Sequence, residues 1–436
     1  MRNVSALVVT ALVMAGACSG DGEASPTTSA APTTPSAPVT TATPTTIPTT
    51  TATPTTAVVT TVPDTVPEPA ADDAGTIVAV LASDEMEGRD DGTPGSRAAQ
   101  LYLAEQLATF AEPAFPGQAG LDGFVQPGPS ANVVGIVRGA ELPNEYVVLG
   151  AHYDGLGDHC RVLDPADSIC NGATDNATGV AAALTVARQL AEHGAPRRSV
   201  VVALWDREED GLRGSADFLA AEVVPPEAIV AYLNWDIQGS NLLPSLTRTS
   251  FVIGAETGGT ALADATRRAT DASSLQYVVF SLVFGQGRSD HANFVAAGVP
   301  SVFFTDVTNG CYHTTGDDLS IVDFGRLDAQ VDVGLALAAD LVDTAQVPQI
   351  ADAPFVTFAD AEQMLALTSA AVTDADLLTS LEPGVIDGYL AELETIVGAG
   401  EEAFDEAATG VLLGGAAMLV EALASTACDG YLDAAG

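Results

Sequence analysis

Strand-like apolar runs alternate with helix-like segments through the middle of this chain, and this alternation constrains the fold more than any other feature. Strands are expected at 132–137, 146–151, 199–205, 228–233, 251–254, 277–280 and 301–305. Helices are expected at 96–110, 179–192, 214–221, 257–272, 289–297 and 324–344. Regular alternation of this kind predicts an α/β fold with a mixed, mostly parallel central sheet covered by helices on both faces.

Acidic and histidine residues follow several of the strand-like runs. In chain order they are His152 in AHYDGLG, Asp175 in NGATDNATG, Glu208 and Glu209 in ALWDREEDG, Asp236 in YLNWDIQG and His313 in CYHTTGDD. Four of these residues come at the carboxyl ends of strands, which is the edge where open α/β sheets bind ligands. Asp175 and His313 lie in Gly-rich or polar loops, where ligands are often carried on a rigid scaffold.

These residue types indicate a metal centre. Imidazoles suit zinc, and a carboxylate can bridge two cations. Two histidines and three carboxylates therefore compose an open two-metal site, and one more adjacent glutamate supplies a general base. The other histidines suit this role less well. His159 lies beside Cys160 in a loop and could be mistaken for a ligand, and His193 is expected to be a cation at the end of a helix. His291 is expected at the start of a helix, where it supports the site or the fold.

The charge of the chain limits its partners. Its 15 basic and 58 acidic residues give a net charge of −43, every basic residue is an arginine, and none follows Arg326. Such a surface repels nucleic acid and anionic membranes, so neither is expected as a partner. Solubility or adaptation to salty water explains the charge more simply than attraction of cationic peptides or divalent ions, and both explanations stay open.

The first residues have the pattern of an export signal. Arg2 supplies a positive charge, residues 6–15 an apolar stretch, and residues 15–17 a small-residue cleavage site. Cys18 follows at once, so the segment resembles a bacterial lipoprotein signal in which this cysteine is lipidated. The expected location is extracellular, tethered to the outer face of the cell membrane, or secreted if Cys18 is not lipidated. No later stretch is expected to be long and apolar enough to span a bilayer.

Four segments are expected along the chain. They are the signal segment 1–18, a Thr/Pro-rich disordered stalk 19–72, the α/β domain 73–348, and an acidic helical appendage 349–436. Export places the four remaining cysteines in an oxidising compartment. Cys160 and Cys170 bracket a short loop and are the first choice for a disulfide, which would leave Cys311 for Cys428.

The ordered set of ligand-type residues resembles the co-catalytic, two-zinc aminopeptidase family, which includes bacterial exported leucyl aminopeptidases. The segments LASDEMEGRDDGTPGSRAAQLYLAEQL, GLRGSADF and GRSDHANFVAAGVPSVFFTD, with CYHTTGDDL after them, extend the resemblance over about residues 77–345. The resemblance implies that His152 and Asp236 bind one zinc ion, that Glu209 and His313 bind the second, and that Asp175 bridges them. It also implies Glu208 as the general base, Tyr312 as a donor to the oxyanion, and Asp154 as the acceptor that orients His152.

The implied function is the removal of amino-terminal residues from peptides by a monomeric exopeptidase with two zinc ions per chain. A carboxypeptidase, a dipeptidase or a single-metal glutaminyl cyclase on the same scaffold is an alternative, and a non-catalytic surface binding lipoprotein is another. WDREED, the HTTGDD segment without the usual proline, and the loop 160–170 depart from the family pattern. The preferred side chain of the substrate and the role of the appendage are left open.

Overall fold

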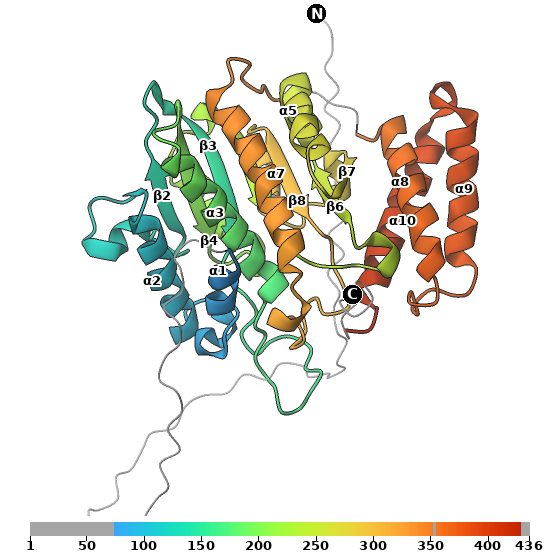
Figure 1. Cartoon of the computed structure of the whole chain (residues 1–436), viewed down its shortest axis with the longest axis horizontal. Coiled ribbons are helices and arrows are strands. Elements are labelled where there is room, and N and C mark those ends of the chain that lie inside the picture. Colours follow the sequence, from blue (N-terminus) through green and yellow to red (C-terminus); the bar gives the residue numbers. More distant parts are fainter. Residues whose placement is uncertain (1–73, 352–354, 429–436) are drawn as a thin grey trace, which may run out of the picture. The chain divides into compact units, whose positions relative to one another are not determined.

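The structure is a computed structural model that describes residues 74–351 and 355–428. The signal segment, Cys18 and the whole stalk lie outside the described residues and stay predictions. The described chain forms an eight-stranded sheet in the order β1-β2-β4-β3-β5-β8-β6-β7 (Figure 1). The strands are β1 Glu112–Pro113, β2 Val133–Val137, β3 Leu142–His152, β4 Arg198–Trp205, β5 Ile229–Trp235, β6 Thr249–Ile253, β7 Gln276–Phe280 and β8 Ser301–Thr305.

The four central strands of the sheet are parallel, and the strands on either side of them run in the opposite direction. Strands β4, β3, β5 and β8 run parallel to one another, whereas β2 is antiparallel to β4, and β6 is antiparallel to β8. The predicted mixed, mostly parallel sheet is confirmed. Strands β4, β5 and β8 are buried along their whole length, and β3 is buried over its last seven residues, as strands covered on both faces must be.

Helices cover both faces of the sheet. They are α1 Ala74–Leu81, α2 Pro94–Ala108, α3 Thr178–Glu192, α4 Arg213–Ala220, α5 Gly259–Asp271, α6 His291–Ala296 and α7 Phe324–Asp343. Alternate residues of one strand face opposite layers: Val200 and Val202 of β4 pack in the cluster with α3 and α7, and Val201 packs with Phe218 of α4 and Phe294 of α6. Figure 1 shows α3 and α7 lying across one face.

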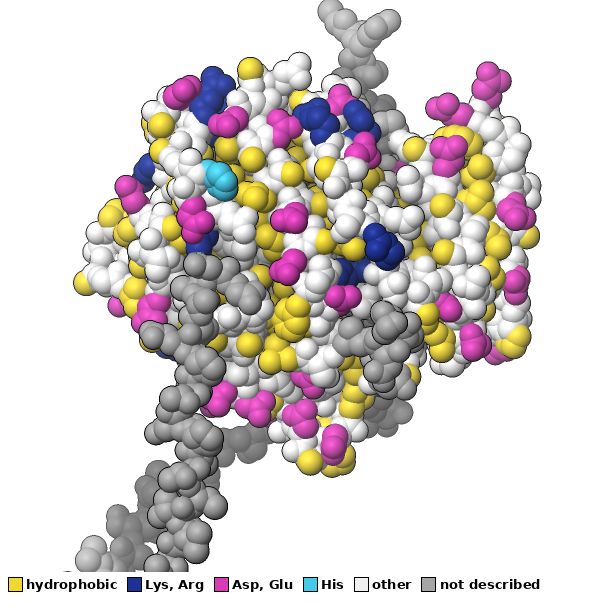
Figure 2. Space-filling view, in the orientation of Figure 1, with side chains coloured by type: hydrophobic (Ala, Val, Ile, Leu, Met, Phe, Trp, Pro, Cys, Tyr) yellow, Lys and Arg dark blue, Asp and Glu magenta, His cyan; other side chains and the backbone are white. Residues whose placement is uncertain are grey.

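The carboxy-terminal region is helical, as the sequence predicts. It consists of α8 Phe358–Ala371, α9 Val385–Ala399 and α10 Glu406–Ala424, which lie beside the β7 edge of the sheet in Figure 1. Helix α8 packs on β7 and α9, and α10 also packs on α9. In Figure 2, acidic side chains are spread over the visible face and do not gather in one patch.

Helix α10 corrects one expectation. It has 19 residues, and an 18-residue window within it has a mean hydropathy of 1.7. By length and composition it could therefore cross a membrane, contrary to the expectation for the chain after the signal segment. About 33% of its apolar window is buried, and Leu412, Leu419 and Leu423 pack in a cluster with α8 and α9. Length and hydropathy alone do not distinguish a packed helix from a spanning one.

Two disulfides cross-link the chain. One joins Cys160 to Cys170, the pairing favoured from the sequence, and the other joins Cys311 to Cys428. The second bond attaches the end of the carboxy-terminal helices to the loop that carries His313. Thr308 reinforces this attachment by donating a hydrogen bond from its hydroxyl to the backbone oxygen of Val420.

Candidate metal centre

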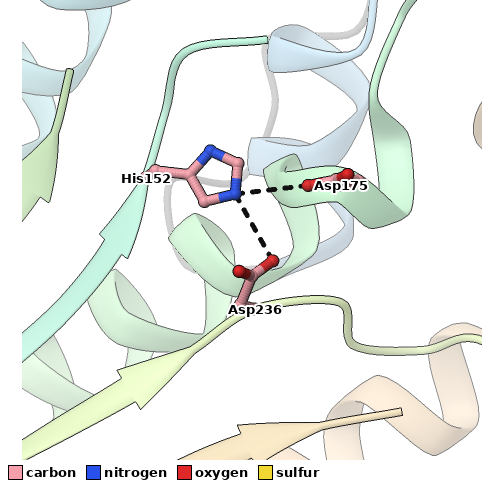
Figure 3. A group of neighbouring side chains, drawn as sticks. All are labelled: His152, Asp175 and Asp236. Carbon is pink, nitrogen blue, oxygen red and sulfur yellow. Dashed lines mark hydrogen bonds and ion pairs between the residues drawn. The ribbon is translucent and has the colours of Figure 1, made fainter. Parts of the chain in front are cut away.

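Sheet register brings the first three ligand candidates together. His152 is the last residue of β3, and Asp236 directly follows β5, which pairs with β3 in parallel with Gly150 opposite Asn234. Counting two residues onward on each strand places His152 opposite Asp236. The His152 Nε2 lies 3.3 Å from an Asp236 oxygen and 3.2 Å from Asp175 Oδ1. Figure 3 draws both contacts as dashed lines.

A second group of ligand atoms forms around the other oxygen of Asp175. The Nε2 of His313, in the loop after β8, lies 3.2 Å from Asp175 Oδ2 and 3.3 Å from Glu209 Oε2. Glu209 comes from the loop after β4. Within each group the ligand atoms lie within 4.8 Å of one another. Asp175 therefore turns one oxygen toward each histidine, as a carboxylate shared by two cations would.

Asp154 holds both glutamates and His152 in place. One of its carboxylate oxygens accepts a hydrogen bond from the backbone N–H of Glu208, and the other accepts one from Glu209, each at 3.1 Å. The His152 Nδ1 lies 3.2 Å from the Asp154 backbone oxygen and 3.5 Å from this carboxylate. An oxygen beside the second ring nitrogen orients a histidine ligand, and the role that the resemblance implied for Asp154 stays a prediction.

Asp317 is a supporting residue that sequence reasoning did not assign. Its carboxylate accepts hydrogen bonds from the backbone N–H groups of Thr174 and Asp175 and from the Thr174 hydroxyl, at 2.8 to 3.0 Å. These bonds fix the backbone that carries Asp175. The only signal in the sequence was the position of Asp317 in the HTTGDD segment.

Arg89 is the second residue without an assigned role. Its guanidinium is fully buried and donates hydrogen bonds to the backbone oxygens of Tyr153, Asn171 and Gly172. Burial lowers its pKa to about 10, so it still carries a charge at neutral pH. One side chain thus connects the segment after His152 with the segment before Asp175. The sequence placed this arginine in a family-like segment but did not reveal its burial.

Glu208 and Tyr312 line the cavity beside these clusters. Glu208 is 8% exposed, and burial raises the pKa of its carboxyl well above the usual value. The Tyr312 ring stacks on His313 with 3.8 Å between the ring centroids. Burial, followed by the charges of Asp175 and Glu209, raises the Tyr312 pKa, so its hydroxyl stays protonated and can donate a hydrogen bond.

The electrostatics of the clusters favour a bound cation. Burial raises the pKa values of Glu209 and Asp236, and nearby carboxylates add to this effect. Burial alone would lower the pKa of His313, but Asp175 and Glu209 raise it to about 10. Imidazole and carboxylate donors converge at each cluster, and such donor sets suit zinc. The residues present therefore fit two zinc ions.

The remaining histidines lie outside both clusters. His159 is exposed and near Asp90, and His193 is exposed at the end of α3, where its ring lies 2.6 Å from the Gln189 backbone oxygen. His291 begins α6, is buried, and stacks on Phe303.

Part of the chain matches a model of a known protein family. Residues 132–338 match the model of peptidase family M28. This part of the chain is similar to the peptidases of family M28. The family match contains every ligand candidate, together with Glu208, Tyr312 and Asp317, and excludes α8, α9 and α10.

Relatives that are similar in sequence are named as different kinds of peptidase. A probable glutamate carboxypeptidase of Arabidopsis thaliana is 32% identical over 48% of this chain and 31% of its own length. An aminopeptidase of Mus musculus is 38% identical over 25% of this chain and 14% of its own. A probable zinc metalloprotease of Leptosphaeria maculans is 28% identical over 61% of this chain and 71% of its own. The chain thus spans less than a third of the length of the first two.

Solved structures show the same fold. The LapA aminopeptidase of Legionella pneumophila superposes with a TM-score of 0.50 and 20% identity, over 63% of this chain and 71% of that one. A glutaminyl cyclase of Porphyromonas gingivalis superposes with a TM-score of 0.50 and 19% identity, over 62% of this chain and 98% of that one. Because one scaffold carries different chemistries, these likenesses establish the fold alone.

Proposed function

We propose that this protein is an aminopeptidase that holds two zinc ions and removes residues from the free amino terminus of peptides. One observation carries the proposal: the two oxygens of Asp175 face His152 and His313, each of which faces a further carboxylate. A single-metal site has no need of the second cluster, so this arrangement disfavours the glutaminyl cyclase alternative.

The residues around the clusters can perform the steps of hydrolysis. When bound there, zinc supplies Lewis acidity that polarises a carbonyl and makes water more acidic. Glu208, with its raised pKa, accepts the proton of the attacking water and returns it to the leaving amine. The Tyr312 hydroxyl donates a hydrogen bond to the developing oxyanion. Asp154 keeps His152 and the two glutamates at fixed positions.

The charge of the cavity favours an α-ammonium over an α-carboxylate. Four carboxylates line the end of the cavity at the clusters, from Asp175, Glu208, Glu209 and Asp236. Arg288 is the only basic residue among the described residues that line the cavity, and it is exposed. A glutamate carboxypeptidase must hold the carboxylates of its substrate with cations, so Arg288 is the one feature that favours this second candidate.

A substrate panel separates the candidates. The zinc-loaded protein is incubated with amino-acid anilides that have a free α-amine, with the same anilides acetylated on that amine, and with amine-blocked peptides that end in a free carboxylate. We expect hydrolysis of the free-amine anilides alone. Hydrolysis of the blocked peptides instead indicates a carboxypeptidase, and zinc binding with no hydrolysis indicates a binding protein.

We also propose that the enzyme acts outside the cell, anchored through lipidated Cys18 by the Thr/Pro-rich stalk. The two disulfides in the described residues suit an oxidising compartment. The test is mass spectrometry of the amino-terminal peptide from the membrane fraction. An acylated Cys18 supports the anchor, and an unmodified terminus in the culture medium supports secretion.

A further inference from the structure

The cavity beside the metal centre has a wall that the peptidase family match does not include. It has a volume of about 130 Å³. Its lining includes Tyr312 and the carboxylates of Asp175, Glu208, Glu209 and Asp236. It also includes side chains of the carboxy-terminal helices: Met364, Leu367 and Ala371 from α8, and Ala416, Leu419 and Leu423 from α10. All six lie beyond residues 132–338.

The wall is packed into the core of the protein. Phe251, Phe280 and Phe303 of strands β6, β7 and β8 line the same cavity, and they belong to the hydrophobic cluster that contains Met364 and Leu419. The helices and the edge of the sheet therefore share one core. A cavity with such continuous packing around it keeps its shape, because protein interiors resist changes in volume.

Polar contacts hold the wall at both ends. At the start of α8, the buried Asp360 accepts hydrogen bonds from the backbone N–H and the hydroxyl of Ser281, at 2.8 and 2.7 Å. At the end of α10, the Cys311–Cys428 disulfide joins the chain to the loop of His313. Gly310 in that loop leaves no room for a side chain, because an added Cβ would lie 2.4 Å from the Thr426 backbone oxygen. The wall is thus fixed relative to the metal centre.

We infer that α8 and α10 complete the pocket for the side chain of the residue being removed, and that the enzyme selects substrates whose first residue is large and apolar. The inference rests on the proposed function, which places the scissile bond at the clusters. The nearest apolar space then receives the side chain next to that bond. Apart from the cluster carboxylates, Glu208, Thr305, Thr308, Tyr312 and the exposed Gln286 and Arg288, the cavity is lined by apolar residues and Gly285. A charged side chain would find no partner along the apolar wall.

Two neighbouring alanines on α10 provide a matched test. Ala416 lines the cavity and is 9% exposed, whereas the next residue, Ala417, is exposed on the outer side of the same helix. Ala416→Leu fills part of the pocket, and Ala417→Leu adds the same side chain to the surface. The values of kcat/KM are measured for the phenylalanine and alanine anilides, and thermal unfolding shows that each variant folds.

We expect Ala416→Leu to lower the ratio of phenylalanine to alanine activity roughly tenfold or more, because small changes of volume in an apolar pocket alter selectivity by such factors. Ala417→Leu should leave the ratio unchanged. An unchanged ratio in a folded Ala416→Leu variant overturns the inference. If that variant does not fold, Leu419→Ala decides: the enlarged pocket should favour the tryptophan over the leucine anilide, and an unchanged preference contradicts the inference.

A binding measurement separates this inference from the proposed function. Calorimetry records the affinity of the zinc-loaded protein for L-phenylalanine and L-alanine. If no anilide is hydrolysed but phenylalanine binds more tightly than alanine, and Ala416→Leu removes this difference, the pocket is as inferred and the peptidase proposal fails. If anilides are hydrolysed but neither measurement responds to Ala416→Leu, the peptidase proposal stands and the pocket assignment fails.

Discussion

The two adjacent glutamates differ in what surrounds their carboxylates. Glu209 directs an oxygen to within 3.3 Å of His313 Nε2 and so belongs to a metal cluster. Glu208 lies in neither cluster, but it is buried and lines the cavity. Neighbouring residues in one loop can thus have different roles, because the chain turns their side chains toward different partners.

We predict that Glu208→Gln keeps both zinc ions but lowers turnover on the order of 10²–10⁴-fold, because an amide cannot accept the proton of the attacking water. Glu209→Ala should instead lower the zinc content, because one cluster loses a ligand. Metal analysis and anilide hydrolysis of both variants distinguish the roles. Near-normal turnover of Glu208→Gln would contradict the assignment of the base.

Asp317 provides a test of how Asp175 is held. Asp317→Ala removes the acceptor of three hydrogen bonds and leaves two buried backbone N–H groups unpaired. We expect zinc affinity to fall roughly 10- to 100-fold, as for other residues that support metal ligands. The control is Asp318→Ala, since the neighbouring carboxylate only caps a short turn at Ser320. Equal zinc affinities of the two variants, measured by competition with a chelator, would rule out this role.

At the scale of single elements, α7 is joined to the sheet by a buried ion pair. Arg326, in the first turn of α7, donates hydrogen bonds to both carboxylate oxygens of Asp306, which follows β8, and its side chain is 1% exposed. Gln330, one turn later, donates to the same carboxylate. The carboxylate thus has several donors, as a charge inside a protein requires.

Removing one partner of this pair should destabilise the fold. We predict that Arg326→Met lowers the free energy of unfolding by about 3–5 kcal/mol, because it leaves the Asp306 carboxylate buried without its cation. Arg268→Met removes an ion pair with Asp340 whose arginine side chain is 57% exposed, and should change stability little. Denaturant unfolding of the two variants provides the comparison, and equal losses would contradict the argument.

At the scale of the whole molecule, the metal centre connects segments from much of the fold. The metal ligands come from five separate segments of the chain: His152, Asp175, Glu209, Asp236 and His313. Because zinc binds the folded arrangement of these ligands, occupancy should stabilise the entire domain. Removal of the metal should therefore destabilise the domain.

We therefore predict that a strong chelator abolishes hydrolysis and lowers the thermal midpoint, and that added zinc restores both. Two zinc ions per chain are expected by metal analysis. With free zinc at 100 times its dissociation constant, one site adds about 2.7 kcal/mol to the stability. Activity that resists the chelator, or a single zinc ion per chain, would count against the two-metal centre.

The sequence by itself determined the alternation of the sheet and the order of the ligand candidates. Both are local properties: the apolar runs mark the buried strands, and residues at the carboxyl ends of parallel strands must meet at one edge. The pattern thus placed His152 and Asp236 at the same edge of the sheet, whereas their pairing was implied only by the resemblance to the two-zinc aminopeptidases. The disulfide between Cys160 and Cys170 could likewise be predicted, because the two cysteines are close in the sequence.

Only the tertiary structure decided which charges are buried and what the last helices do. Asp317 meets Asp175 across 142 residues, and Arg89 meets Gly172 across 83, so neither contact leaves a periodic signal in the sequence. Helix α10 has the composition of a possible membrane span, yet its packing makes one side of it a wall of the cavity. The physical reason is that the composition of a segment determines how apolar it is. Whether its apolar side packs against protein or lipid depends on contacts with segments that are distant in the sequence.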